Sequence, residues 1–181
     1  LIGLHNQDNI RGALTVTTIL GISYQDGVKT LPTFKPLPHR LECVGTYSDI
    51  TFYDDAISTT PESTIAALRA LPQTSTIFLG GEDRGYDFSE LARVLHQSKV
   101  AQIILFPHSG LRIKKELDAI VDARWTVCET SSMREAVAYA FTHTQPGTIC
   151  LLSTASPSYS LWKNFIEKGM QFQQFVKGYE K

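Results

Sequence analysis

The chain has 181 residues, a length that suits one domain or one domain with part of another. Hydrophobic residues make up 43% and charged residues 19%, a composition typical of a globular rather than a disordered protein. Seventeen basic residues against 18 acidic ones give a net charge of −1, so no basic surface argues for nucleic acid or an anionic membrane. The longest apolar runs, such as "TICLL", are too short to span a bilayer.

The three cysteines, Cys43, Cys128 and Cys150, lie far apart in apolar, strand-like segments. This pattern predicts free, buried thiols in a reducing compartment. The first ten residues have neither the basic region nor the cleavage pattern of a signal peptide, and the chain does not begin with methionine. We therefore expect a cytoplasmic piece of a longer protein.

The first predicted element is a helix over residues 6–20, because Ile10, Leu14 and Leu20 lie near one of its faces. Residues 21–39 follow and are rich in glycine and proline. Proline removes a backbone donor and resists helix formation, so this segment is interpreted as a linker with a domain boundary near residue 36.

From residue 40 onward, short β-branched runs alternate with helical patterns. The runs "RLECVGTY" and "ITFYDD" are joined by the tight turn "SD", which predicts an antiparallel hairpin. Thr60 and Pro61 predict the N-cap and first position of the next helix. Further strands are expected at 75–81, 100–106, 125–129 and 147–153, with helices at 61–71, 88–97, 109–120, 132–144 and 161–177. The last helix is expected to bury Trp162, Phe165, Ile166, Gly169, Phe172 and Val176.

The predicted strands are apolar throughout, as expected when both faces of a sheet are covered. The order of elements predicts an α/β fold: a mostly parallel sheet with helices on both faces and an antiparallel hairpin at its start. No internal repeat or low-complexity segment is present in the sequence.

Ligands of open α/β sheets bind beyond the carboxyl ends of the strands, and this rule selects four turns. They are "DDAISTT", "LGGEDRGYDF", "FPHSG" and "STASPSY". The glycines of the second turn either adopt positive φ in a tight turn or bring backbone close to a ligand, with Arg84 available for a carboxylate or phosphate. The hydroxyls of the fourth turn either cap a helix or hold a polar ligand group.

Several catalytic patterns are missing from the sequence: a Walker A loop, a GxGxxG fingerprint, metal-ligand spacing of histidine with cysteine or carboxylate, and a Ser-His-Asp or Cys-His motif. The residues alone therefore predict an α/β domain that binds a small anionic ligand at its strand ends.

Five segments carry a resemblance to a known family. They are "HNQDN", "LPHRLE", "FYDDAISTTPEST", "IFLGGEDRGYDFSELA" and "LLSTASPSYSLWKNFIEKGMQF". In this order they resemble the Mur ligases, and most of all the member that adds D-glutamate to UDP-N-acetylmuramoyl-L-alanine in peptidoglycan synthesis. The similarity covers nearly the whole chain. It implies that residues 1–36 are the end of a central ATPase domain with its linker, and that residues 37–181 are the Rossmann-like C-terminal domain that binds the amino acid.

The resemblance implies ATP-dependent amide formation, with ATP and Mg²⁺ as cofactors. UDP-N-acetylmuramoyl-L-alanine, D-glutamate and the upstream domains of the same protein are the implied partners; neither nucleic acid nor membrane insertion is expected. The P-loop and the magnesium ligands are expected upstream of this chain, so the chain alone is expected to be inactive and to supply no metal ligand. The alternatives are another Mur ligase, a folylpolyglutamate synthase domain, or a non-catalytic domain that binds small anions.

The resemblance also implies roles for individual residues. Asn6 and Asn9 match asparagines near the adenine. His39 and Arg40 match a hinge whose arginine reaches the ATP phosphates after domain closure, and Asp55 matches an aspartate that touches the ribose and helps to hold this arginine. The implied cofactor-binding residues are therefore Asn6, Asn9, His39, Arg40 and Asp55. Arg40 and Asp55 are thus the catalytic candidates. The implied substrate contacts are Thr59, Arg84, Ser158, Tyr159 and Phe165.

One position departs from the family pattern. The lysine expected two residues after Asp55 is replaced by Ile57. Arg84 stands where this ligase usually has a lysine for the same substrate, and a guanidinium can bind a carboxylate through two N–H groups. We therefore expect Arg84 to take over carboxylate recognition.

Overall fold

The computed structural model describes residues 3–179, apart from the side chain of His5, and divides into two compact units, Leu1–Pro38 and His39–Lys181. The first unit contains α1 (Leu4–Ile19), α2 (Tyr24–Thr30) and the short 3-10 helix η1 (Leu31–Thr33). The division falls close to the boundary expected near residue 36. The assignment of the first unit to an ATPase domain stays a prediction.

Helix α2 lies inside the segment that the sequence analysis interpreted as a linker. Ser23 begins this helix as its N-cap, and its side chain accepts a hydrogen bond from Asp26 N at 3.2 Å. Asp26 in the first turn also pairs with Lys29 Nζ at 2.8 Å. The prolines of this segment all follow the helix, so they end it and do not prevent it.

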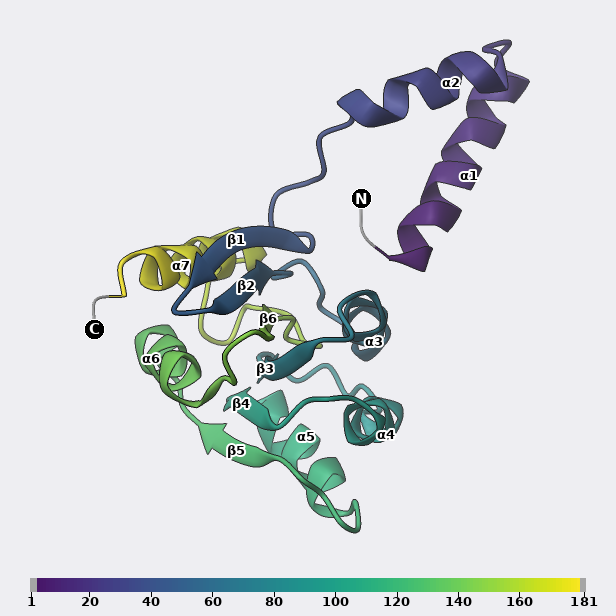
Figure 1. The fold of residues 1–181 in the computed structure, drawn as a ribbon. Coiled ribbons are helices and arrows are strands. Elements are labelled where there is room, and N and C mark those ends of the chain that lie inside the picture. Colours follow the sequence, from purple (N-terminus) through teal and green to yellow (C-terminus); the bar gives the residue numbers. More distant parts are fainter. Residues whose placement is uncertain (1–2, 180–181) are drawn as a thin grey trace. The chain divides into compact units, whose positions relative to one another are not determined.

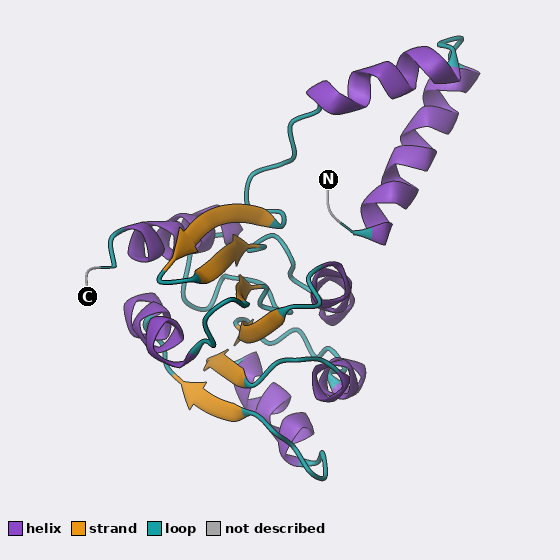
Figure 2. Cartoon of the chain, viewed as in Figure 1, coloured by secondary structure: helices purple, strands orange, loops and turns teal. Residues whose placement is uncertain are grey.

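The second unit is built on one six-stranded sheet with the order β1-β2-β6-β3-β4-β5 (Figures 1 and 2). The strands are β1 (Glu42–Tyr47), β2 (Ile50–Asp54), β3 (Thr74–Gly80), β4 (Gln102–Phe106), β5 (Thr126–Glu129) and β6 (Ile149–Leu152). The helices are α3 (Pro61–Ala70), α4 (Ser89–Gln97), α5 (Ser109–Asp118), α6 (Met133–His143) and α7 (Phe165–Lys177). Strands β1 and β2 are antiparallel, and every other pair is parallel, so the predicted α/β fold class is confirmed.

Two hydrophobic cores cover the two faces of the sheet. Ile77 and Leu79 of β3 face a core with the apolar sides of α3, α4 and α5, whereas Phe78 between them faces a second core with α6 and α7. The same alternation follows β4 and β6, because successive side chains of a strand point to opposite faces. Helices therefore cover both faces, as predicted, and the strand ends are left for the connecting turns.

Three details differ from the predictions. All three cysteines are free, but only Cys150 is buried; Cys128 is half-buried and Cys43 is exposed, because β1 is an edge strand.

Helix α7 begins at Phe165 rather than residue 161, since Asn164 is its N-cap and accepts from Glu167 N at 2.9 Å. Gly169, Phe172 and Val176 of α7 are buried as predicted, but Ile166 is 46% exposed. Lys168, which was not predicted to face the core, is fully buried. Within residues 3–179, no helix is long and apolar enough to cross a membrane.

Candidate functional site

The carboxyl ends of β2, β6 and β3 lie side by side in the sheet, because these strands are parallel neighbours. Residues 55–60, 153–158 and 81–88 follow these three ends. Three of the four turns selected from the sequence are thereby brought to one edge. The fourth, which follows β4, is joined to this edge by the backbone, since His108 N and Ser109 N both donate to Gly81 O.

Asp55 ties two of these turns to the start of the second unit. One of its oxygens accepts from Leu41 N at 3.2 Å, and the other accepts from Ser153 Oγ at 2.8 Å. The residue is 2% exposed, and its burial raises the pKa of the carboxyl group to about 6 despite hydrogen bonds that lower it. Each of its two oxygens therefore has a hydrogen-bond donor from this chain.

The hydroxyls of the turn after β2 begin helix α3. Thr60 is the N-cap and forms a capping box with Ser63, and Pro61 occupies the first turn, as predicted. The neighbouring Thr59 is half-buried at the same helix start. Ile57 is also half-buried, at the position where the family pattern has a lysine.

The glycines of "GGEDRG" are required by close packing of backbone. Gly80 and Gly81 have φ of 99° and 151°. A Cβ on Gly80 would lie 2.1 Å from Phe106 O, and one on Gly81 would lie 2.3 Å from Pro157 O. The expected positive φ is confirmed, and these glycines serve packing between neighbouring strand ends.

Two arginines lie beside this glycine turn. Arg84 is half-exposed and its guanidinium lies 3.2 Å from Glu82. Arg112 of α5 pairs with Asp83 at 2.8 Å and was not singled out in the sequence. Glu82 N donates to Pro157 O at 2.8 Å, so the turn that carries Arg84 is joined to the serine-rich turn after β6.

The hydroxyls of the serine-rich turn do not cap a helix, because α7 starts well after them. Ser153 donates to Asp55, Thr154 donates to the carbonyl of Ser156 at 3.0 Å, and Ser156 Oγ accepts from Ser109 at 2.7 Å. Ser158 is different. It is 2% exposed, and its hydroxyl and that of Ser160 are the buried side-chain oxygens without a hydrogen-bond partner among residues 3–179. Such an oxygen is costly unless a ligand satisfies it.

A buried amine lies behind this turn. Lys168 of α7 is fully buried, and its Nζ donates to Thr154 Oγ1 and lies 5.9 Å from the ring centre of Trp162. Burial lowers the pKa of Lys168 to about 7, while the charges of Asp54 and Asp55 act in the opposite direction.

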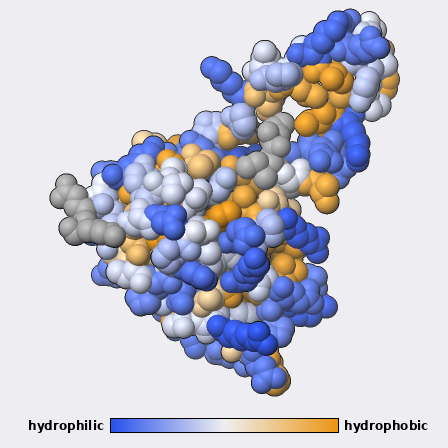
Figure 3. Space-filling view, viewed as in Figure 1, coloured by the Kyte–Doolittle hydropathy of each residue, from blue (hydrophilic) through white to orange (hydrophobic). Residues whose placement is uncertain are grey.

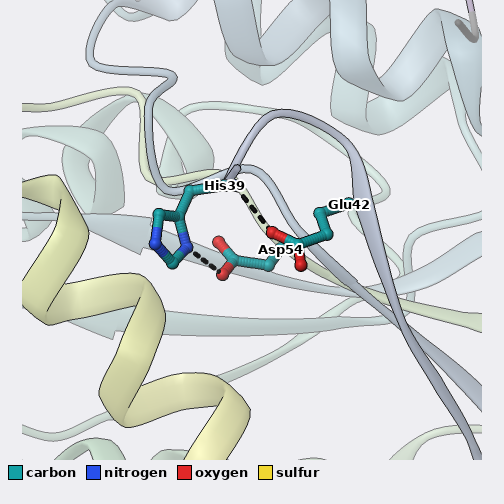
Figure 4. Close-up of side chains that lie close together, drawn as sticks. All are labelled: His39, Glu42 and Asp54. Carbon is teal, nitrogen blue, oxygen red and sulfur yellow. Dashed lines mark hydrogen bonds and ion pairs between the residues drawn. The ribbon is translucent and has the colours of Figure 1, made fainter. Parts of the chain in front are cut away.

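His39, Glu42 and Asp54 lie close together at the start of the second unit (Figure 4). The His39 ring Nδ1 is 2.7 Å from Asp54 Oδ2, and the His39 backbone N–H donates to Glu42 Oε2 at 2.8 Å. One ligand atom from each residue lies within 4.8 Å of the others, a spacing that a divalent cation could also use. The two hydrogen bonds account for this proximity, so we assign no metal to the cluster.

Comparison with known proteins decides the family. The profile of the family described as "Mur ligase, glutamate ligase domain" matches residues 39–156, more than half of the chain. The chain belongs to the Mur ligase family.

Curated relatives of this family carry more specific names. UDP-N-acetylmuramoylalanine–D-glutamate ligase of Aquifex aeolicus (strain VF5) is 32% identical over 97% of this chain and 41% of its own length. UDP-N-acetylmuramoyl-L-alanine–L-glutamate ligase of Salinispora tropica is 35% identical over 98% of this chain and 40% of its own length. The crystal structure of MurF from Acinetobacter baumannii has a TM-score of 0.69 and 20% identity, over 97% of this chain and 38% of that one. The chain thus spans about two fifths of the length of the Mur ligases that it matches.

The structure brings some of the residues expected from the Mur ligase pattern together. Leu41, the residue after Arg40, donates its backbone N–H to Asp55, so these two candidates lie close to one hydrogen bond. Phe165 meets the His39 ring edge-on, with ring centroids 6.3 Å apart. Ser158 and Arg84 lie in the two joined turns, and Tyr159 beside Ser158 is 65% exposed. Asn6 and Asn9 lie in the first unit, where Asn9 Nδ2 is 3.4 Å from Asn6 Oδ1.

Some residues of this edge were missed by the sequence analysis. Asp54 pairs with the predicted His39, Gln173 donates to Asp54, and Lys168 donates to Thr154 of the serine-rich turn. None of the three was predicted as a site residue. The spacing of Lys168, three residues after Phe165 and four before Phe172, was a usable signal, because it places the lysine on the apolar face of α7.

Proposed function

We propose that this chain is the C-terminal part of an ATP-dependent ligase that adds glutamate to UDP-N-acetylmuramoyl-L-alanine in peptidoglycan synthesis. The observation that carries the proposal most directly is the buried, unpaired hydroxyl of Ser158, in a turn joined to the one that carries Arg84. A hydroxyl and a guanidinium at the strand ends match the needs of a carboxylate substrate. The names of the curated relatives support the same substrates.

The proposed reaction needs positioning and charge neutralisation rather than a nucleophilic side chain. The alanine carboxylate of the precursor receives the γ-phosphoryl group of ATP, the glutamate amine attacks the acyl phosphate, and phosphate leaves. In this chain Arg40 would contact the ATP phosphates. Asp55 would touch the ribose and hold Leu41, the residue after Arg40. The substrates would be bound by Thr59, Arg84, Ser158, Tyr159 and Phe165. Magnesium would be held by residues outside this chain.

The first unit supports the view that the chain works together with further domains. Among the described residues of the first unit, Leu14 is the large apolar residue that is buried. Figure 3 shows an apolar patch on its helices. The exposed large apolar residues are Leu4, Val16, Ile19, Leu20, Ile22, Tyr24, Val28, Phe34 and Leu37. An exposed apolar face of this size is typical of an interaction surface. We propose that the rest of the ATPase domain of the same protein covers it in the cytoplasm and brings its adenine near Asn6 and Asn9.

A phosphate-release assay tests the proposal. The longer protein that contains this chain should release phosphate from ATP and Mg²⁺ only when UDP-N-acetylmuramoyl-L-alanine and glutamate are both present. The 181-residue chain alone should release none above background. Turnover by the 181-residue chain alone would contradict the proposal that the reaction needs the upstream domains. Turnover of the longer protein with a folate substrate instead would favour the folylpolyglutamate synthase alternative, and the absence of turnover with any substrate would favour a binding domain.

A second candidate differs in the handedness of the amino acid. The Salinispora tropica relative, named as an L-glutamate ligase, is as similar to this chain as the D-glutamate ligases are. The replacement of the expected lysine by Ile57 removes one cation from the D-glutamate pocket that the family pattern implies. Parallel assays with D- and L-glutamate separate the two candidates, because kcat/KM reports which enantiomer the transition state prefers.

A further inference from the structure

The backbone on both sides of Arg40 is held in an unusual conformation. His39 has φ of 61° and Leu41 has φ of 46°. Residues with a Cβ avoid this left-handed region, at a cost of about 1–2 kcal/mol each, and adopt it only where neighbouring groups enforce it. The direction in which the Arg40 side chain leaves the chain is therefore set by whatever holds these two residues.

Asp54 holds the side chain of His39. A carboxylate oxygen accepts hydrogen bonds, so the 2.7 Å contact requires that Nδ1 of His39 carries the hydrogen. Asp54 is fully buried and also accepts from Ala56 N at 3.0 Å and from Gln173 Nε2 at 2.9 Å. Its oxygens face protein donors rather than the strand-end surface, so Asp54 supports the site rather than binding a ligand.

The backbone of the same segment is fixed separately. The N–H of His39 donates to Glu42, and its carbonyl accepts from Ile57 N at 3.2 Å. The N–H of Leu41 donates to Asp55. The two adjacent aspartates of "YDDA" thus hold one flank each of Arg40.

Helix α7 closes this arrangement from one side. A Cβ on Gly169 would lie 2.2 Å from His39 Nδ1 and 2.7 Å from Asp54 Oδ2, so only glycine leaves room for the pair. Gln173 of the same helix, one turn further on, donates to Asp54. The glycine in the motif "KNFIEKGMQF" is explained by this contact.

We infer that the His39–Asp54 pair, seated on Gly169 and Gln173 of α7, is a positioning device that presets Arg40 for the ATP phosphates. His39 acts through Arg40 and not by touching the nucleotide, since its ring is 7% exposed and bonded to Asp54. This inference rests on the proposed function, because only that function gives Arg40 a phosphate to meet.

The first test uses the 181-residue chain and needs no activity. Nitrogen NMR of the ring should show hydrogen on Nδ1 of His39 in the wild-type chain. In Asp54→Asn and in Gly169→Ala, the amides of His39 and Leu41 should exchange with solvent at least about tenfold faster, while amides of β4 keep their rates. Asp49→Asn, in an exposed turn, and Gly12→Ala, on a helix where a Cβ meets nothing within 4 Å, are the matched controls.

The second test uses the longer protein. Asp54→Asn and Gly169→Ala should lower kcat at least about tenfold and leave KM for the UDP-precursor within about twofold, as expected for a residue needed after closure. A ring with hydrogen only on Nε2, or wild-type kcat in variants whose His39 and Leu41 amides exchange fast, would overturn the inference. If the wild-type longer protein makes no amide bond, the proposed function fails, and the ring and exchange measurements still decide whether the pair holds this segment.

Discussion

At the scale of single residues, Arg84 is the side chain on which glutamate recognition is proposed to depend. Its partner Glu82 is half-buried, but Arg84 itself is half-exposed and the pair lies at the surface, where ion pairs contribute little. The guanidinium can therefore turn to a carboxylate. Losing a charge-assisted contact of this kind costs about 1.5–3 kcal/mol, or roughly 10- to 150-fold in affinity. Arg84→Ala in the longer protein should therefore raise KM for glutamate by about that factor and leave KM for ATP nearly unchanged.

Arg93→Ala is the matched control for Arg84→Ala, since Arg93 is also an exposed arginine paired with a glutamate, at 2.6 Å from Glu90. Steady-state kinetics of the two variants with each substrate varied in turn provide the measurement. If Arg84→Ala behaves like Arg93→Ala, the carboxylate must be held by Thr59, Ser158 and Tyr159 instead.

Lys168 should make stability depend on pH. In the folded chain its pKa is about 7, and in the unfolded chain it is close to the ordinary 10.5. Between these values the unfolded state binds more protons, so the free energy of unfolding should rise as pH increases from about 7 to 10.5. The penalty of burying the charge is fully present below pH 7 and fades across this window. The pKa of Asp55 in the folded chain is about 6, so its contribution to the free energy of unfolding changes below pH 7 and not between pH 7 and 10.5.

Lys168→Met removes the buried amine. The difference between the folded pKa of about 7 and the ordinary 10.5 corresponds to roughly 5 kcal/mol, and the loss of the hydrogen bond to Thr154 offsets about 2 kcal/mol of it. The variant should therefore be more stable than the wild type by roughly 3 kcal/mol at pH 6, and this gain should shrink toward pH 10. Urea unfolding of the chain at several pH values measures it, with Lys163→Met, an exposed lysine, as the control. A gain that does not change with pH would show that Lys168 keeps its ordinary pKa.

The sequence singled out candidates in the turns after the strands, but it did not indicate the buried groups that support these turns. Arg84 and Ser158 stood out because they lie in polar turns after predicted strands. Asp54 did not, because nothing in the sequence separates a buried carboxylate at the end of an apolar strand from a solvated one. Lys168 was not predicted either, although its spacing from Phe165 and Phe172 places it on the apolar face of α7. Their roles depend on contacts between α7 and β2, which are far apart in the sequence.

At the scale of elements, two neighbouring threonines at the start of α3 should have different functions. Thr60 caps the helix, so Thr60→Ala should lower the free energy of unfolding by about 1 kcal/mol. Thr59→Ala should change it by less than about 0.5 kcal/mol, as typical surface substitutions do, but should raise KM for glutamate in the longer protein. Chemical unfolding of both variants, together with kinetics, separates them. Equal losses of stability would mean that Thr59 also supports the helix.

Short-range sequence patterns predicted most helices and strands of the second unit. The strand and helix alternation, the β1–β2 hairpin and the Thr60 cap follow from residues within a few positions of one another. Helix α2 was missed because the prolines that follow it dominated the interpretation of a segment whose cap is Ser23. The start of α7 was placed too early because Trp162, buried in the loop before the helix, continues the apolar spacing of the helix itself.

At the scale of the whole molecule, the two units should differ in stability. The second unit has two hydrophobic cores on one sheet, whereas the first is a pair of helices with a short 3-10 turn and little buried apolar surface among its described residues. Isolated helices of this length are marginal in water unless an apolar face is packed. Local opening should therefore occur in the first unit well below the free energy of global unfolding.

Brief digestion of the 181-residue chain with trypsin measures this difference. Cleavage after Arg11 and Lys29 should come first and leave a resistant fragment that contains β1 to α7. Arg69 and Lys99 of the second unit serve as internal references, because both are exposed: Arg69 lies on the packed helix α3, and Lys99 lies shortly before β4. In the longer protein, where the ATPase domain is proposed to cover the first unit, the cuts after Arg11 and Lys29 should slow by at least about tenfold. Equal cleavage rates in both proteins would contradict the proposal that the rest of the ATPase domain packs on these helices.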